Sequence, residues 1–154
     1  MRKILVTGGT VFVSRFIAEH YVAKGDEVYV LNRNTRPQSA GVKLIQADRH
    51  AIKIVENNME EDIDLILAVG AGTIHDISRY IAHNYKVPFI SVPTAASGDG
   101  FVTTVAAMTL DGVKKTVPSV APICVYADTD IFSKAPQRLT AVSYTHLRAH
   151  ETDS

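Results

Sequence analysis

The chain has 154 residues, and its 16 lysines and arginines are balanced by 16 aspartates and glutamates, so its formal net charge is zero. This balance, without a basic excess or a charge run, argues against a nucleic-acid partner and against binding to a membrane surface. No apolar run approaches the roughly 20 residues of a membrane-spanning helix, and the single cysteine, Cys124, excludes an intrachain disulfide. We therefore expect a cytoplasmic protein with the length of one domain.

Apolar segments of strand length alternate with helical patterns along most of the chain. A buried strand is predicted at residues 3–7. It is followed by a helix in which Phe12, Phe16, Ile17 and Tyr21 recur at helical spacing and which Gly25 ends. Further strands are predicted at residues 27–31, 42–46, 64–69 and 88–92, with a weak helix at 52–58 and a longer one at 74–84.

The content of β-branched residues rises between residues 101 and 126, and Asp111-Gly112 divides this segment. The pattern indicates a β-hairpin and one extra strand. Cys124 lies there in the apolar run APICVYA, which predicts a small core residue. The predicted fold is α/β and Rossmann-like, with a mostly parallel sheet, a C-terminal β-hairpin and a disordered tail.

The first glycine turn, TGGTVFVS, follows a predicted strand and opens a predicted helix. Glycine at such a turn lets the backbone approach a dinucleotide's pyrophosphate, whose charge the helix N-terminus stabilises. Gly8 fits the spacing G-x-x-G-x-x-G, but Val11 and Ser14 stand at its second and third glycine positions. A purely structural turn is therefore the alternative.

The segment MRKILVTGGTVFVSRFIAEHYVAKGDEVYVLNRN resembles the NAD-dependent epimerase/dehydratase family of extended short-chain dehydrogenases. The resemblance covers residues 1–50. It implies that Gly8, Gly9 and Phe12 face the pyrophosphate and that Asp48, in the sequence ADRH, lies near the adenine. The catalytic Tyr-x-x-x-Lys of that family is absent from this sequence.

The second predicted strand runs into Asn32-Arg33 instead of an acidic residue. An acid at this point binds the ribose 2′-hydroxyl of NAD, whereas an arginine suits the 2′-phosphate of NADP. Arg33 therefore favours NADP in this half of the chain, whereas the later half is compatible with either NAD or NADP.

A second glycine turn, AVGAGTIHD, places Gly70 and Gly72 between a strand and a helix, with Asp76 following. Backbone amides at such a helix start are suited to a phosphate. Asp76 is expected within the first helical turn, so stabilising the helix end is its alternative role. The next strand runs into PTAASGDGF, at residues 93–101, which gathers hydroxyls and a carboxylate where α/β proteins bind ligands. An ordinary glycine-rich turn is the alternative there.

Residues 62–141 resemble the sn-glycerol-1-phosphate dehydrogenases of the iron-containing alcohol dehydrogenase/glycerol dehydrogenase superfamily. The resemblance is carried by LAVGAGTIHDISRYIAHNYKVPFISVPTAASGDGF and by KKTVPSVAPICVYADTDIFSKAPQRLTA. It implies reduction of dihydroxyacetone phosphate, a small phosphorylated substrate, by a nicotinamide nucleotide cofactor. The cofactor contacts that it implies are Gly70, Gly72, Asp76, Thr94 and Thr103, and the substrate contacts are Asp99 and Ser97.

The same resemblance implies a divalent metal that polarises the substrate alcohol while a hydride moves to the nicotinamide. Its ligands in that superfamily are an aspartate just after the segment APQRLTA and two histidines further on. Here the chain continues as VSYTHLRAHETDS, and residues 142–152 match a translated sequencing adaptor. We expect the metal ligands to be absent and the chain to be catalytically inactive.

Two glycine turns of different spacing suggest two parents. We expect residues 1–141 to form one nucleotide-binding domain, with an epimerase-like part at 1–50 and a glycerol-1-phosphate dehydrogenase-like part at 51–141, and residues 142–154 to be an artefactual tail. The join near residues 46–58 makes the chain an assembly chimera; a natural protein whose first turn is only structural is the alternative. An epimerase/dehydratase fragment and a non-catalytic nucleotide-binding module are alternative functions, and a homo-oligomer is left open.

Overall fold

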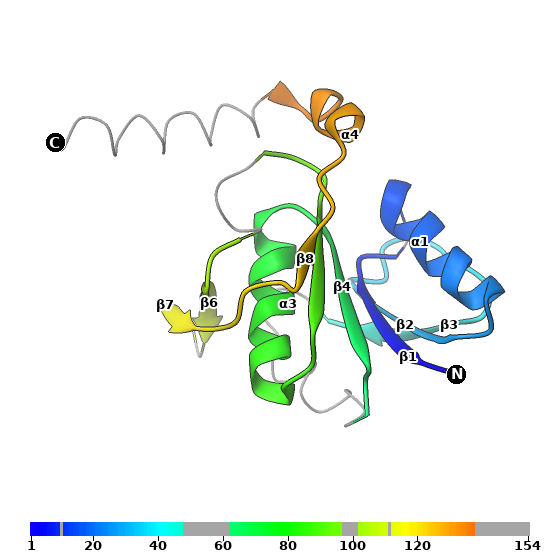
Figure 1. Cartoon of the computed structure of the whole chain (residues 1–154), viewed down its shortest axis with the longest axis horizontal. Coiled ribbons are helices and arrows are strands. Elements are labelled where there is room, and N and C mark those ends of the chain that lie inside the picture. Colours follow the sequence, from blue (N-terminus) through cyan, green and yellow to red (C-terminus); the bar gives the residue numbers. More distant parts are fainter. Residues whose placement is uncertain (10, 48–61, 97–101, 111, 138–154) are drawn as a thin grey trace, which may run out of the picture.

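The computed structural model describes residues 1–9, 11–47, 62–96, 102–110 and 112–137 (Figure 1). The helices are α1 (Phe12–Ala23), α3 (Gly72–Tyr85) and α4 (Thr129–Ser133). The strands are β1 (Lys3–Thr7), β2 (Glu27–Asn32), β3 (Val42–Gln46), β4 (Leu65–Gly70), β5 (Phe89–Pro93), β6 (Val105–Leu110), β7 (Val113–Pro118) and β8 (Cys124–Val125). None of the helices in these ranges is long and apolar enough to cross a membrane.

The main sheet has six strands in the order β3-β2-β1-β4-β5-β8, all paired in parallel. The chain builds outward from β1 toward β3, and then returns to build outward from β4 toward β8. The order therefore reverses between β1 and β4, where Thr7 lies opposite Ala68. In open parallel sheets, ligands bind at this switch point, beyond the carboxyl ends of the strands.

The predicted fold class is confirmed: the fold is α/β with a mostly parallel sheet and a hairpin of β6 and β7. The strand at residues 3–7 and the strand at 42–46 have the predicted bounds, and the other predicted strands are shifted by one residue or less at each end. Gly25 adopts φ of +82° just after α1, as the predicted end of that helix requires. The predicted helix at 52–58 and the tail lie outside the described residues.

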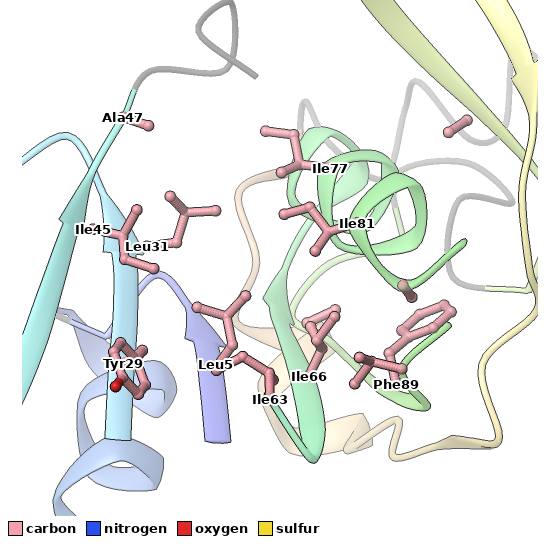
Figure 2. Close-up of a cluster of buried hydrophobic side chains, with 14 of the residues drawn as sticks. Leu5, Tyr29, Leu31, Ile45, Ala47, Ile63, Ile66, Ile77, Ile81 and Phe89 are labelled. Atoms are coloured by element: carbon pink, nitrogen blue, oxygen red, sulfur yellow. The ribbon is translucent and has the colours of Figure 1, made fainter. Parts of the chain in front are cut away.

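The two faces of the sheet bury different side chains because neighbouring residues of a strand point to opposite sides. One face packs Ile4, Val6 and Leu67 with Ala18 of α1. The other face packs against α3, as Figure 2 shows for Leu5, Ile66, Ile77, Ile81 and Phe89. Full burial of each large aliphatic side chain contributes about 1.5–3 kcal/mol, so this alternation accounts for much of the sheet's stability.

The hairpin packs beside α3, on the side of the helix away from β4 (Figure 1). Ala106 and Met108 of β6 are buried in the same cluster as the α3 side chains, whereas β7 is largely exposed. The prediction that Cys124 is a core residue is wrong: the cysteine is exposed on β8. β8 is a two-residue strand paired only with β5 among the described strands, so it has no second neighbour to cover it.

We expect Gly9→Ala to destabilise the fold more than Gly25→Ala. Both glycines have positive φ, +84° and +82°, so both substitutions strain the backbone by about 1 kcal/mol. A Cβ on Gly9 would also lie 2.5 Å from Val30 Cγ1, whereas nothing lies within 4 Å of one on Gly25. Overpacking adds about 1–3 kcal/mol at Gly9 alone. Urea unfolding of both variants measures the difference, and equal losses of stability would contradict the close packing.

Candidate functional site

The two glycine turns lie side by side at the carboxyl end of the sheet. β1 runs into Gly8 and β4 ends at Gly70, and the parallel pairing of Thr7 with Ala68 brings the two ends level. A Cβ on Gly8 would lie 3.5 Å from the carbonyl oxygen of Val69. The two turns therefore flank the single switch point of the sheet and belong to one site.

Two helices begin at this site, on opposite faces of the sheet. α1 starts at Phe12, just after the first turn, and α3 starts at Gly72, within the second (Figure 1). Neither N-cap residue, Val11 or Ala71, makes a side-chain hydrogen bond to cap its helix. The partial positive charges of both helix starts thus face the switch point, which favours an anion there.

The second turn is held against the strand that follows α3. The amide of Thr94 donates a hydrogen bond to the carbonyl oxygen of Gly70, at 2.9 Å, so the predicted cofactor residues Gly70 and Thr94 are neighbours. A Cβ on Gly70 would lie 2.9 Å from Ile74 Cγ1. Glycine is needed here because α3 approaches its own entry turn closely.

Asp76 does not lie in the first turn of α3. The helix begins at Gly72, and its first turn contains no acidic residue, so the alternative role in stabilising the helix end is wrong. The carboxylate of Asp76 instead accepts a hydrogen bond from Nη1 of Arg79, at 3.3 Å, and its side chain is 20 % exposed. Asp76 is therefore oriented by a neighbour one turn further along the same helix.

The first turn is held by Asn32, at the end of β2, where an acidic residue would bind the ribose of NAD. Its Nδ2 donates to the carbonyl oxygen of Gly8 at 2.8 Å and to Oε1 of Gln38 at 3.0 Å. Ser14 lies close below the turn, with Oγ 3.1 Å from the position of a Cβ on Gly8. The departure from the glycine spacing at residue 14 thus still leaves a small side chain where the turn meets α1.

Three further predicted cofactor residues belong to this half of the site. Phe12 opens α1 with φ of +52° and is 56 % exposed. Gly9 is buried against Val30. Arg33 is exposed and follows β2 directly, and no ion pair to it is found among the described residues. Asp48 lies outside the described residues.

The loop between β5 and β6 is described only at its two ends. Thr103 is half-buried, and its Oγ1 accepts a hydrogen bond from the amide of Val105. Ser97 and Asp99, the predicted substrate contacts, lie outside the described residues. Their placement beside Thr94 and Gly70 stays a prediction.

Arg79 and Asn32 contact the predicted site residues Asp76 and Gly8, and no motif in the sequence marks either of them. Arg79 is fully buried on α3 although the neighbouring buried positions are mostly apolar. A charged residue at helical spacing among buried positions, such as Ile77, Ile81 and Ala82, was the available signal. No comparable sequence signal marks Asn32, because its role depends on the loop that brings Gln38 back to it.

A hollow of about 440 Å³ lies on the face of the sheet opposite α3. Its lining is apolar apart from a few polar tips, and comes from α1, the sheet and Tyr126. It offers no helix start and no glycine turn to a phosphate. The switch point between β1 and β4 therefore remains the candidate site.

A parallel sheet with glycine turns and two helix starts at its switch point is the arrangement of Rossmann-like α/β folds. Comparison with known families identifies one family within this fold class. The chain matches the model of the iron-containing alcohol dehydrogenases over residues 10–136, and it belongs to that family. The match begins just after Gly8 and Gly9, so a single family extends over the helix that follows the first glycine turn and over the whole second turn.

The curated relatives are consistent with this family. The chain is 47 % identical over 106 residues to a glycerol-1-phosphate dehydrogenase (NAD(P)+) of Geobacillus thermodenitrificans, covering 69 % of this chain and 26 % of the relative. It is 44 % identical over 98 residues to the enzyme of the same name from Bacillus velezensis, covering 64 % and 25 %. The chain thus spans about a quarter of the length of these relatives.

Solved structures show the same fold. The glycerol dehydrogenase of Schizosaccharomyces pombe superimposes with a TM-score of 0.65 at 20 % sequence identity, covering 92 % of this chain and 34 % of that one. This likeness extends over nearly the whole chain.

The two groups that the family implies fit the described residues differently. A dinucleotide fits, because both glycine turns and the starts of α1 and α3 meet at the switch point of the sheet, where helix starts favour a diphosphate. For a metal ion, the described residues contain no group of three or more His, Cys, Asp or Glu side chains that could hold one. We therefore derive no chemical step through a metal.

We expect His75 to make stability fall between pH 6.5 and about pH 4. Burial lowers the pKa of His75 from 6.5 to about 4, although a contact with the carbonyl of Ala71 opposes this. The folded state therefore keeps the ring neutral while the unfolded chain takes up a proton, so the contribution is full above pH 6.5 and is lost as the pH falls.

Between about pH 7 and about pH 5 this loss amounts to about 2 kcal/mol. Urea unfolding of the wild type and of His75→Asn at both pH values isolates it, because the acidic groups are common to both proteins. The difference in stability between the two proteins should change by that amount. A difference independent of pH would contradict the lowered pKa.

Proposed function

We propose that this chain provides the NAD(P)-binding domain of an sn-glycerol-1-phosphate dehydrogenase, the enzyme type that reduces dihydroxyacetone phosphate. The observation that carries the proposal is the meeting of Gly8, Gly70 and Thr94 at one switch point, between the starts of α1 and α3. The names of the relatives, with 47 % and 44 % identity, support the substrate class.

The proposed roles follow from position. The backbone at Gly70 and Gly72 and at Gly8 and Gly9 faces the diphosphate, since each pair stands at a turn that leads into a helix. The amide of Gly8 itself donates a hydrogen bond to the carbonyl oxygen of Leu31, at 2.9 Å. Thr94 and Asp76 border the second turn, and Phe12 borders the first. When bound, NAD(P)H supplies the hydride, and these residues hold and orient it.

Other proposed contacts rest on the sequence alone. Ser97 and Asp99 orient the phosphorylated substrate, Thr103 adds a contact at the end of the same loop, and Asp48 lies near the adenine. A cytoplasmic location and a homo-oligomer are proposals of the same kind. We also propose the division at residue 50, the chimeric origin, the epimerase-like first part and the adaptor-derived tail. A family match that begins at residue 10 nevertheless favours a single parent protein.

The DNA that encodes the chain tests the chimera. Long reads across codons 46–58 and 140–154 from the source should either reproduce the present sequence or break at these positions. A continuous read through codons 46–58 supports one natural gene.

Titration of the purified chain with NADH and NADPH, followed by nucleotide fluorescence, tests the function. We expect saturable binding. We expect no oxidation of bound NADPH by dihydroxyacetone phosphate, because positioning and electrostatic activation of the carbonyl supply most of such a rate enhancement, and this chain spans about a quarter of the length of the relatives. Gly70→Val, which crowds Ile74, should abolish binding. Steady turnover of dihydroxyacetone phosphate would show that the predicted inactivity is wrong. Absence of binding of both NADH and NADPH would contradict the proposed function.

We expect Arg33 to set a preference for NADPH over NADH. Its exposed guanidinium follows β2, where the adenosine ribose is held in dinucleotide-binding folds, and it suits a 2′-phosphate. Arg33→Ser should weaken NADPH binding about tenfold and leave NADH binding nearly unchanged. Arg36→Ser, another exposed arginine of the same loop, is the matched control. Equal effects of Arg33→Ser on both nucleotides would contradict the assignment.

A further inference from the structure

Arg79 is the residue at which the candidate cofactor helix meets the hairpin. Its side chain is fully buried on α3, and a guanidinium stays charged at any pH at which proteins fold. Burying such a charge is costly unless it is paired and hydrogen-bonded. A buried arginine so close to a proposed cofactor site therefore calls for a specific role.

The guanidinium joins Asp76 to the hairpin. Its Nη1 donates to Oδ1 of Asp76 at 3.3 Å and also to the carbonyl oxygen of Val105, the first residue of β6. Because the side chain of Asp76 is still 20 % exposed, the arginine fixes the carboxylate without covering it. One nitrogen thus connects a proposed cofactor contact with the start of β6.

The main chain of Arg79 holds the other strand of the hairpin. Oγ of Ser119, just after β7, donates to the carbonyl oxygen of Arg79 at 2.7 Å. The amide of Ser119 in turn donates to the carbonyl oxygen of Thr104 at 2.8 Å, which closes the open end of the hairpin. Arg79 therefore bonds both to the start of β6 and to the residue just after β7.

These bonds also fix the two ends of the segment between β5 and β6. At its start, the amide of Thr94 is bonded to Gly70 of the second glycine turn. At its end, Val105 is bonded to Arg79. The segment that contains Ser97 and Asp99 is thus anchored at both ends to the turn and the helix that form the candidate site.

We propose that Arg79 is a positioning residue of the dinucleotide site, which sets the carboxylate of Asp76 and links its orientation to the open end of the hairpin. The inference rests on the proposed function. If Arg79 acts through Asp76, replacing either residue weakens dinucleotide binding by a similar factor, and replacing both weakens it no further. Occupation of the site also restrains β6 through the same pair.

The test uses the full chain with Asp76→Asn, Arg79→Lys and the double variant. Lysine keeps the positive charge but lacks the planar fork of donors, so it does not serve Asp76 and Val105 together. Ser119→Ala is the matched control, because it removes a bond between α3 and the hairpin without touching Asp76. Nucleotide fluorescence gives the NADPH affinity, and hydrogen exchange of the amides of Val105–Leu110 reports on β6 with and without NADPH.

We expect Asp76→Asn and Arg79→Lys each to weaken NADPH binding about tenfold, and the double variant to equal the single ones. Ser119→Ala should lower the melting temperature but keep the affinity within about twofold of wild type. NADPH should slow exchange in β6 of the wild type and of Ser119→Ala, and not in Arg79→Lys. A purely structural arginine would not produce this ligand-dependent difference.

Three results would overturn the inference: wild-type affinity in Arg79→Lys, multiplied effects in the double variant, or a loss of affinity in Ser119→Ala as large as in Arg79→Lys. Should Arg79→Lys fail to fold, Asp76→Asn decides alone, because NADPH-dependent protection of β6 that persists without the carboxylate contradicts the link. A wild-type chain that binds neither NADH nor NADPH overturns the proposed function and the inference with it. If the wild-type chain binds NADPH and any of the three results above is found, only the inference is overturned and the proposed function stands.

Discussion

The parallel pairing of β1 with β4 is the constraint on which the candidate site depends. With Thr7 opposite Ala68, the two strands end level, and each runs directly into glycine. The helices that follow leave on opposite faces of the sheet, so their positive ends lie on either side of the same edge. A slip of this register would separate the turns, and neither turn alone presents two helix starts to one diphosphate.

The surrounding contacts keep that arrangement in place. Asn32 secures the first turn through Gly8, and Thr94 secures the second through Gly70. Oγ of Ser78 lies 3.1 Å from Oγ1 of Thr7, which in turn donates to the carbonyl oxygen of Leu67, so polar contacts tie α3 to β1 and β4 beneath the turns. The hairpin, which contributes no strand to the main sheet, joins the same system through the buried guanidinium of Arg79.

Much of the fold was predictable from the sequence because its signals are local. Buried parallel strands appear as short apolar runs such as residues 3–7 and 64–69, and helices appear as apolar spacing such as that of Ile17 and Tyr21, which pack against the sheet. The motif GAGTIHD likewise marked the start of α3 correctly to within two residues. Predictions that depend on neighbours were weaker: Cys124 lies in an apolar run and is nevertheless exposed, because β8 is a short strand at the edge of the sheet.

The sequence by itself determined most of the strands, the helices α1 and α3 and the two glycine turns, since glycine freedom and hydrophobic period are properties of short segments. The short helix α4 was not predicted. The relation between the turns was decided only by the tertiary structure. Gly8 and Gly70 are far apart in the chain, and their glycine motifs have different spacings, which suggested two parent proteins. The strand order nevertheless makes the two glycines neighbours. The pairing of Asp76 with Arg79 and of Asn32 with Gly8 was likewise fixed by packing, because a hydrogen bond depends on distances that chain position does not specify.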